Sequence, residues 1–393
     1  MRVLIISTPV STHLAPLIPL AWGLRAAGHQ VLVAGQPDVV GTARDGGLSV
    51  AVVGEAFHVT DVLMGGLPPG LRPVQAVGRP EPAALGAATR VWTMHARYVL
   101  GPYLELARRW RPDLVVSDRL EYAALLVGGA LGVPVVQHRW GIDVIATAGW
   151  AGARRAMTGP ARRLGLDALP EPALVLDPAP AVLQSPDADP AVPVRYVPCN
   201  GVGTVPAWAH RPTRPRRVCV TLGRMTLDLN GAGLLRTVVE AFRLLPDVEG
   251  LVTVGAEHRG CLEQVPDNVS VVDPAPLDLF LDTCDAIVHH GGSGTCLTAA
   301  AIGLPQLVLP QLLDMFEVGD RVVAAGVGLS LDDAARQDDP ADVAGALGRL
   351  LDDPAFGRAA TALAADVARM PAPGALVPRL EELAAATDQR LAG

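Results

Sequence analysis

Short apolar runs alternate with longer amphipathic stretches through the first third of the chain. Helices are expected where apolar positions recur at helical spacing and a glycine or proline follows, over Pro16–Ala27, Ala88–Trp110 and Glu121–Leu131. The runs with the length and composition of buried strands are Arg2–Ile6, Gln30–Ala34, Leu114–Ser117 and Val133–Gln137. Strand, crossover and strand in this order predict a parallel sheet with right-handed connections.

The last 180 or so residues repeat the same plan. Buried strands are expected at Arg217–Leu222, Leu251–Val254, Val269–Val272, Asp285–Val288 and Gln306–Leu309. Helices are expected at Gly231–Leu245, Thr295–Ile302 and Phe316–Ala325, and in a tail from Pro340 to Leu391 that breaks at Pro354 and at residues 371–373. A second α/β domain is therefore predicted.

Two stretches lack this pattern. Residues 54–90 are rich in glycine and proline and are expected to form a long mobile excursion with apolar tips. Prolines recur densely between residues 170 and 215, which indicates a linker with short strands at Leu174–Leu176 and Arg195–Val197. We place the domains at residues 1–205 and 206–393, with the last helix a candidate to pack back on the first domain.

The stretch from Ile287 to Thr295 reads as a strand end, a glycine turn and a helix start. Glycines let the backbone approach a ligand closely, and the free N–H groups of a helix N-terminus attract anions. Two histidines and two hydroxyls lie in or beside the turn, at His289, His290, Ser293 and Thr295. This combination favours a phosphate site.

Other interpretations of the same turn fit less well. A serine-hydrolase elbow, G-x-S-x-G, needs glycine where Thr295 stands. A dinucleotide fingerprint needs a different glycine spacing. A metal site at His289 and His290 is less favoured, because adjacent side chains point apart and no cluster with zinc spacing accompanies them. A glycine turn without any ligand remains an alternative.

Charge and length narrow the class of partner. The net charge of −8 argues against nucleic acid or an anionic membrane surface. No run of about 18 apolar residues predicts a membrane span, and the N-terminus lacks the pattern of a signal peptide. With 393 residues, half of them hydrophobic, the chain is expected to be a two-domain cytoplasmic protein.

The chain contains no lysine, and its five cysteines are irregularly spaced. The cysteines are expected to be free thiols in a reducing compartment. Without lysine, neither a P-loop nor pyridoxal phosphate chemistry is possible. A phosphate must then be held by arginine, histidine, hydroxyls or backbone. The one D-x-D sequence, at residues 187–189 among prolines, is expected to be an exposed turn and not a metal clamp.

Polar residues at other predicted strand ends are candidates for chemistry, because ligands of such sheets bind beyond the carboxyl ends of the strands. His13 follows the first strand and can serve as a general base. Asp118 ends a later strand and is expected to hydrogen-bond the other imidazole nitrogen; a helix N-cap is its rival role. In the second domain, Gly223 and Arg224 follow a strand and suit a phosphate, and Gln311 and Asp314 suit sugar hydroxyls.

Together, the motif at residues 289–295, the pair Pro310-Gln311 with Asp314, and the segment from Pro9 to Pro19 resemble glycosyltransferases of the GT-B fold. Within that class, the chain is similar to the actinomycete enzymes that attach deoxysugars to polyketides and other natural products. The resemblance spans nearly the whole chain. It implies two Rossmann-like α/β domains that face each other across a cleft, with the acceptor bound to the first and a nucleotide diphosphate sugar, of the dTDP type, bound to the second.

The resemblance also implies an inverting transfer without metal or other cofactor. By similarity, His13 deprotonates the acceptor hydroxyl and Asp118 orients it. Donor contacts are expected from residues of the second domain, namely Gly223, Arg224, Ala275, Leu277, His289, His290, Gly291, Gly292, Ser293, Gly294, Thr295, Gln311 and Asp314. Many relatives have Asp-Gln where this chain has Asp314-Met315, and methionine cannot hydrogen-bond a sugar hydroxyl as glutamine does. This departure favours a deoxygenated sugar.

Apolar residues of the first domain indicate a hydrophobic acceptor. The candidates are Phe57, Met64, Trp92, Met94 and Trp140. Two other functions stay open: a nucleotide-sugar epimerase that does not hydrolyse its substrate, and a non-catalytic auxiliary binding protein of the same fold. The identities of sugar and aglycone, the atom glycosylated and the oligomeric state, including a homodimer, are also open.

Overall fold

The first half of the chain forms a fully parallel sheet with the strand order β3-β2-β1-β4-β5-β6-β7. The computed structural model describes residues 1–392, with the side chains of all of them except residues 82 and 387–392. The strands are β1 (Arg2–Ile6), β2 (Gln30–Gly35), β3 (Val50–Val52), β4 (Leu114–Asp118), β5 (Val135–His138), β6 (Leu174–Asp177) and β7 (Val192–Pro193).

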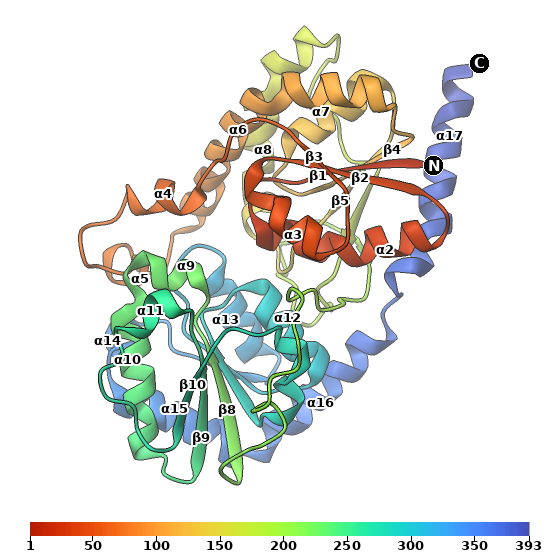
Figure 1. Ribbon diagram of the computed structural model, residues 1–393. Coiled ribbons are helices and arrows are strands. Elements are labelled where there is room, and N and C mark those ends of the chain that lie inside the picture. Colours follow the sequence, from red (N-terminus) through yellow and green to blue (C-terminus); the bar gives the residue numbers. More distant parts are fainter. Residues whose placement is uncertain (393) are drawn as a thin grey trace.

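Helices cover both faces of this sheet (Figure 1), which explains why its strands are apolar throughout and not alternating. Leu4 and Ile6 point to one face, and Val3 and Ile5 to the other. The first face packs against α6 (Pro82–Trp110), α7 (Tyr122–Leu131) and α8 (Ile145–Arg163). The second packs against α2 (Ile18–Ala26), α3 (Val40–Asp45) and α17 (Val377–Ala392), and the short α1 (Ser11–Leu14) precedes α2.

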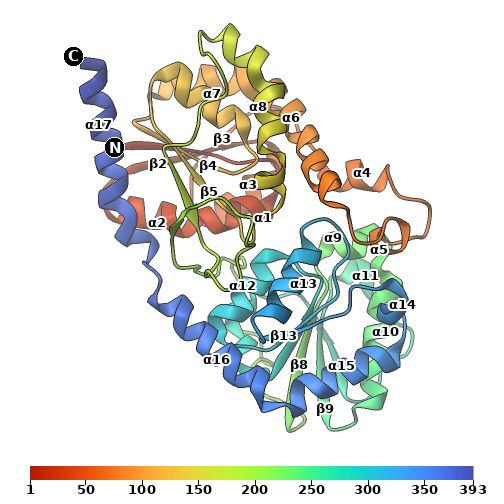
Figure 2. The same cartoon turned by 180° about the vertical axis from the view of Figure 1, so that it is seen from behind.

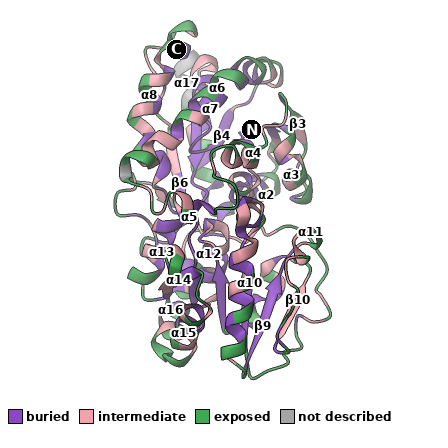
Figure 3. Ribbon diagram, turned by 90° about the vertical axis from the view of Figure 1, so that its left-hand side faces the viewer, coloured by how far each residue is buried: buried purple, intermediate pink, exposed green. Residues whose placement is uncertain are grey.

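The second half forms another parallel sheet, in the order β10-β9-β8-β11-β12-β13. Its strands are β8 (Arg216–Thr221), β9 (Val248–Thr253), β10 (Val269–Val272), β11 (Ala286–His289), β12 (Gln306–Val308) and β13 (Gly328–Ser330). The helices are α9 (Arg224–Thr226), α10 (Ala232–Ala241), α11 (Ala256–Arg259), α12 (Ser293–Ile302), α13 (Met315–Ala324), α14 (Ala334–Gln337), α15 (Pro340–Asp352) and α16 (Pro354–Arg369). Figure 3 shows both sheets as buried layers between more exposed helices. The expected pair of Rossmann-like domains is confirmed.

Both sheets reverse their strand order at one point, between β1 and β4 and between β8 and β11. Loops at such a switch point form the ligand crevice of open α/β sheets. His13 and Asp118 lie at the first switch point, and Gly223 and the glycine turn at the second. Figure 2 shows the two domains one above the other, with α17 running back along the first.

Two expectations about elements need correction. Helix α6 begins at Pro82 and not at Ala88, and the short strand β7 lies at Val192–Pro193 and not at Arg195–Val197. Helix α8 is an element for which the sequence analysis made no prediction. The Asp143 side chain caps the start of α8 by accepting the N–H groups of Ala146 and Thr147 at 3.1 and 3.3 Å. Pro160 lies inside this helix, where proline is unusual. No helix among the described residues is long and apolar enough to cross a membrane.

The segment expected to be a long excursion forms a strap, which we define as residues 57–80. It contains α4 (Val59–Met64) and α5 (Pro73–Ala76) and leaves the first domain to lie on the second (Figure 1). Asn230 Nδ2 donates to the Leu71 carbonyl at 2.9 Å, and Arg79 pairs with Asp320 at 2.6 Å. Glycine and proline in this segment therefore shape a path across the other domain.

Candidate active site between the two sheets

His13 lies on the short helix α1 after β1, with 12% of its side chain exposed. Burial lowers the pKa of His13, and the nearby Asp118 carboxylate opposes this effect more weakly. The imidazole is therefore neutral at pH 7, the state that a general base needs. Among the described residues, hydrogen bonds engage only its Nδ1 atom.

Asp118 does not bond His13 directly, which corrects the expected arrangement. Its Oδ1 lies 3.8 Å from Nδ1 of His13, beyond hydrogen-bond length. Thr8 lies between them: its Oγ1 is 2.8 Å from the His13 Nδ1 and donates to Asp118 Oδ2 at 3.0 Å. Since the Thr8 hydroxyl has one proton and gives it to the carboxylate, it must accept the Nδ1 proton of His13. This fixes the tautomer with Nε2 as the free base.

Backbone groups hold the Asp118 carboxylate in place. The N–H of Thr8 donates to Oδ2 at 2.7 Å, and the N–H of Leu120 donates to Oδ1 at 2.9 Å. The rival role as a helix cap falls to Glu121, whose side chain accepts the N–H of Ala123 at the start of α7. Asp118 therefore stabilises the turn after β1, and the Thr8 hydroxyl connects the carboxylate to His13 through two hydrogen bonds.

Trp140 connects His13 to the second domain. Its ring stacks on the His13 imidazole with 4.3 Å between centroids and 12° between planes. Its indole N–H faces the carboxylate of Asp314, and burial raises the pKa of Asp314 to about 6. The loop that carries Trp140 is fixed by Arg139, which pairs with Asp143 at 3.2 Å and Asp177 at 2.5 Å. A candidate catalytic group and a candidate sugar ligand thus meet through one side chain.

The glycine turn after β11 has the geometry expected of an anion site. Gly291 has φ of 91°, and a Cβ there would lie 2.8 Å from the Met315 carbonyl, so only glycine fits. Gly292 caps α12 without a side chain, which leaves the first N–H groups of the helix without intrahelical acceptors. The Ser293 hydroxyl is buried and has no hydrogen-bond partner among the described residues.

The first domain approaches this turn closely. A Cβ on Gly141, the residue after Trp140, would lie 2.2 Å from the Ser293 Cβ. Tyr196 donates to the Gly294 carbonyl at 3.1 Å, which ties α12 to the segment after β7. The structure therefore has the two domains in contact directly over the helix N-terminus.

His289 is placed differently from the expected phosphate ligand. Its Nδ1 accepts the N–H of Gly291 at 3.1 Å, its Nε2 donates to Gln306 at 2.9 Å, and the side chain is fully buried. Burial lowers its pKa to about 3. With both nitrogens occupied, the ring shapes the turn and leaves no atom for a phosphate. The adjacent His290 ring packs between Gly223 and Gly292, where any Cβ would come within 2.6 Å of it.

The remaining donor candidates lie around this turn. Gly223 begins α9 with φ of 72°, and Arg224 follows it, exposed and without an ion-pair partner among the described residues. Thr295 is half-buried in the first turn of α12. Ala275 and Leu277 are half-buried beside a short 3-10 helix, Leu277–Leu279, which contacts α12.

Gln311 has no free polar atom, contrary to its expected role toward sugar hydroxyls. Its Oε1 accepts from Arg72 of the strap at 2.9 Å. Its Nε2 donates to the carbonyls of Leu309 and Pro310 and to Gln337, at 2.8, 3.1 and 2.8 Å. Sequence reasoning missed Arg72, because nothing in a glycine- and proline-rich stretch indicates that it crosses to the other domain.

A cluster of aromatic rings extends from His13 into the first domain through Trp92. Trp92 lies 6.1 Å from His13 and 5.9 Å from Phe57, and His95 packs edge-on against Phe57 and Trp92. Met94 is not part of this cluster: it lies on the opposite face of α6 and is 69% exposed, because residues two apart on a helix point to opposite sides. Met64 lies on the strap at the end of α4.

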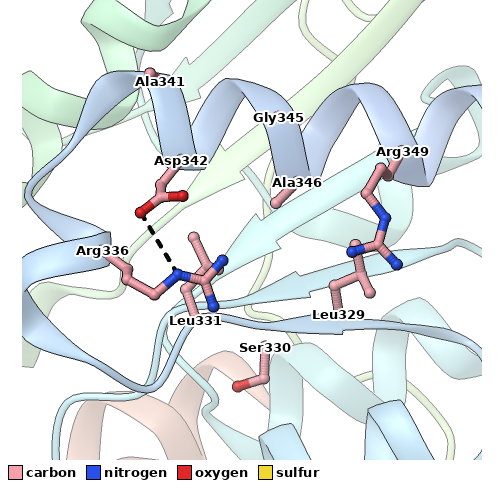
Figure 4. Close-up of a pocket in the computed structure, with 9 residues that line it drawn as sticks. All are labelled: Leu329, Ser330, Leu331, Arg336, Ala341, Asp342, Gly345, Ala346 and Arg349. Carbon is pink, nitrogen blue, oxygen red and sulfur yellow. Dashed lines mark ion pairs between the residues drawn. The ribbon is translucent and has the colours of Figure 1, made fainter.

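Two cavities lie outside this cluster. One of about 220 Å³ lies between the strap and the second domain and is lined by mainly aliphatic side chains, including Leu67, Leu229 and Leu313. Figure 4 shows the other, of about 270 Å³, between β13 and α15, where Arg336 pairs with Asp342 at 3.5 Å. No residue of the first domain lines the second cavity, so we place it outside the candidate site.

Metal ligands were also sought in the part of the chain that the structure describes. No group of three or more histidine, cysteine, aspartate or glutamate side chains there could hold a metal ion. Asp189 of the D-x-D sequence is instead an ion-pair partner of Arg119 at 2.9 Å. All five cysteines are free thiols, as expected.

Most of the chain matches a known family. Domain profiles described as erythromycin biosynthesis protein CIII-like match residues 22–223 with the N-terminal domain and residues 237–383 with the C-terminal domain. The chain belongs to this CIII-like family. Among its relatives, the tylactone mycaminosyltransferase of Streptomyces fradiae is 35% identical, over 98% of this chain and 93% of the relative. The 10-deoxymethynolide desosaminyltransferase of Streptomyces venezuelae is 33% identical, over 98% and 97%.

Solved structures agree with this assignment. The spinosyn rhamnosyltransferase SpnG has a TM-score of 0.87 and 38% identity to the CIII-like chain, covering 97% of it and 100% of SpnG. SpnG has also been solved with thymidine diphosphate and with the spinosyn aglycone. This CIII-like protein is a glycosyltransferase with the GT-B architecture, which confirms the resemblance identified in the sequence.

Proposed function

We propose that this glycosyltransferase moves a deoxysugar from a thymidine diphosphate donor to a hydrophobic, polyketide-type acceptor, with inversion at the anomeric carbon. The names of the relatives support the sugar and acceptor classes, and the SpnG complex supports the nucleotide. The observation that carries the proposal is the contact between domains: the His13 ring stacks on Trp140, and Trp140 faces Asp314 of the second domain. A base and a sugar ligand then act on one reaction centre.

The proposed reaction begins with the acceptor hydroxyl. His13 Nε2 removes its proton as the oxygen attacks the anomeric carbon of the donor sugar, an assistance worth about 10²–10⁴-fold in rate. The imidazolium that forms still donates its Nδ1–H to the Thr8 hydroxyl, which in turn donates to Asp118. The carboxylate stabilises this positive charge through the intervening hydroxyl. One C–O bond forms while the bond to the diphosphate breaks, so attack occurs opposite the leaving group and the configuration inverts.

The leaving diphosphate gains negative charge as that bond breaks. We assign its stabilisation to the N-terminus of α12, where backbone N–H groups and the hydroxyls of Ser293 and Thr295 are available. Donors fixed in advance toward developing charge are effective because they need no reorganisation during the reaction. The buried, unpartnered Ser293 hydroxyl supports this role. Arg224 is a second candidate contact, and Gly223, Gly291 and Gly292 give the backbone room.

We assign Asp314 to a hydroxyl of the donor sugar and Met315 to its deoxygenated face. Met315 presents an apolar side chain beside the glycine turn and is 7% exposed. His289 and Gln311 are proposed as supports of the turn and of the loop before Asp314, because their polar atoms are occupied within the protein. Phe57, Trp92 and Trp140 are proposed to contact the acceptor.

A direct assay tests the proposal. The full chain is incubated with a thymidine diphosphate deoxysugar and a panel of polyketide aglycones, with and without EDTA. The expected result is thymidine diphosphate together with a product heavier by one sugar, at the same rate in EDTA, with the anomeric configuration inverted by NMR. Retained configuration, or strict dependence on a divalent metal, would reject this mechanism. Conversion of the donor without an acceptor would instead indicate an epimerase.

A further inference from the structure

Arg72 is a buried arginine in the middle of the strap, only 2% exposed although the strap itself lies at the surface. Every partner of its guanidinium belongs to the second domain. Nη1 donates to Gln311 at 2.9 Å and to Gln337 at 2.8 Å, and Nη2 pairs with Asp338 at 2.5 Å. A second strap residue contacts the carboxylate of Asp338, because Gln75 Nε2 donates to it at 2.9 Å.

The two glutamines that receive Arg72 form a closed set of hydrogen bonds. Gln337 accepts from both Arg72 and Gln311, and its own Nε2 donates to the carbonyls of Pro310 and Leu331 at 3.0 and 2.7 Å. Both amide side chains are fully buried. Removing Arg72 leaves the Gln311 Oε1 without its donor in a buried place, which is unfavourable. The network is therefore complete only when the strap is docked.

The loop that this network holds ends at Asp314. Leu313 has φ of 45°, a left-handed conformation that a leucine keeps only where its surroundings enforce it. On one side of Leu313, Gln311 is held by Arg72; on the other, Asp314 is held by Trp140 of the first domain. Leu313 itself packs against the hydrophobic cluster of the first domain. Residues 310–314 are thus fixed from both ends by groups of the opposite domain.

We propose that Arg72 is a positioning residue for donor recognition, which sets the loop 310–314 so that Asp314 meets the sugar when the strap is closed. This inference rests on the proposed sugar contact of Asp314. Arg72 touches neither substrate nor the reacting atoms. The strap then couples closure over the second domain to recognition of the sugar part of the donor, and leaves the diphosphate to α12.

The strap offers its own control. Arg79 also crosses to the second domain, where it pairs with Asp320 at 2.6 Å and Asp332 at 3.5 Å, but it is 45% exposed. Water screens such a pair, so its loss has little effect. An Arg79→Met variant therefore removes one strap charge and two interdomain ion pairs, and none of the partners lies in the loop 310–314.

The test compares Arg72→Met, Arg72→Lys and Arg79→Met in the full chain. Hydrogen exchange is followed in residues 57–80 and 309–315, and calorimetry gives the affinities for thymidine diphosphate and for thymidine diphosphate rhamnose. Arg72→Met is expected to speed exchange in both segments and to weaken binding of the sugar nucleotide by about tenfold or more, as lost hydrogen bonds to a charged group imply. Binding of thymidine diphosphate alone stays within about twofold, by the same reasoning that assigns it to α12.

The controls separate the outcomes. Lysine at position 72 keeps the charge but cannot reach three acceptors, so partial recovery is expected; Arg79→Met is expected to change exchange only within the strap. Unchanged exchange at 309–315 in Arg72→Met, or equal weakening of both nucleotides, overturns the proposal. If Arg72→Met fails to fold, Asp338→Asn gives the same test. Asparagine has the same size as aspartate but lacks the negative charge that pairs with Arg72. If the wild type binds neither nucleotide, the donor class is wrong, and the exchange data still decide the role of Arg72.

Discussion

Thr8 illustrates how one hydroxyl can decide the state of a catalytic base. The distance of 3.8 Å between His13 and Asp118 is too long for a hydrogen bond, and the threonine hydroxyl fills the gap with one acceptor and one donor interaction. This arrangement keeps a full negative charge from touching the imidazole. Burial can then lower the pKa of His13, as the structure indicates, while the carboxylate still orients the ring through Thr8.

Removing the Thr8 hydroxyl is expected to slow transfer without weakening the donor complex. In Thr8→Val the His13 Nδ1 proton and Asp118 lose their shared partner, and an unsatisfied buried group costs about 1–3 kcal/mol. A fall in kcat of about 10–100-fold follows from that cost. His13→Ala is expected to lose about 10²–10⁴-fold. Thr8→Ser, which keeps the hydroxyl, is the control, and affinity for thymidine diphosphate is measured in parallel. Equal rates in the valine and serine variants would remove the relay.

The acid side of the pH profile is expected to report Asp314. Burial raises its pKa from 3.8 to about 6, so the carboxylate is ionised above that pH and becomes protonated as the pH falls through it. The pKa of His13 is lowered from 6.5, so two ionisations suppress kcat/KM on the acid side. In Asp314→Asn only His13 remains, and the acid limb becomes shallower. An acid limb of unchanged steepness in that variant would contradict the assignment.

Positions at strand ends were predictable from the sequence, and their partners were not. His13, Asp118 and Ser293 each follow an apolar run, which places them at the ligand edge of a parallel sheet. Thr8 lies in a polar segment after β1, and the sequence does not reveal the distance between its hydroxyl and the His13 ring. His289 attracted attention as a histidine beside glycines, but its ring is occupied by Gln306, a residue seventeen positions away on a neighbouring strand.

At the scale of elements, α12 is an apolar helix whose N-terminus is the part proposed to bind the ligand. Its interior is small and buried, with Cys296, Leu297 and Ala300 packed between sheet and neighbouring helices. The N-terminus is the part that meets the other domain, next to Gly141 and Tyr196. Packing therefore fixes the direction in which the free N–H groups point.

Removing both hydroxyls of that first turn is expected to weaken nucleotide binding. Each neutral hydrogen bond contributes about 0.5–1.5 kcal/mol, so Ser293→Ala combined with Thr295→Ala predicts about 10–100-fold weaker binding of thymidine diphosphate. Backbone N–H groups remain, so binding is not abolished. Calorimetry on the double variant gives the value. Thr361→Ala, which removes an exposed hydroxyl from α16, is the control, and identical affinity in all three proteins would make the turn purely structural.

Most elements were predictable because they carry strong local signals. Most strands of both sheets contain a short apolar run, and α7 and α12 end in glycines with left-handed backbone, Gly132 and Gly303. The strap was not predictable, since its order depends on Arg72 and Arg79 finding carboxylates and amides in residues 311–338. Helix α8 was missed because its alanines, glycines and arginines give only a weak apolar stripe.

At the scale of the whole molecule, the contact between domains has almost no tolerance at one point. Gly141 lies against Ser293 so closely that a methyl group has no room, although its backbone conformation suits any residue. Each sheet also has hydrophobic clusters of its own, away from this contact. The contact therefore limits how far the two domains can approach, and not whether they fold.

Gly141→Ala is expected to fold normally and to hold the domains slightly apart. Misplacement of reacting groups by about 1 Å can cost about 10²-fold in rate, so kcat is expected to fall by that order. The melting temperature is expected to match that of Gly152→Ala, a control on α8 where an added methyl group meets nothing within 4 Å. A rate equal to that of the control would show that the two loops separate during turnover.

The final helix gives the chain an unusual order of parts. Leu376, Val377 and Leu380 belong to the hydrophobic cluster of β1 and α2, and Glu381 lies 3.0 Å from His29, which also contacts the amino terminus. Half of the enzyme is thus encoded in two separate pieces that enclose the other half. A chimaera that takes its first domain from a relative must also take α17 from that relative. Otherwise α2 of one protein packs against α17 of the other. Conversely, joining the two ends and opening the chain in the linker near residue 206 would make each half a contiguous gene segment.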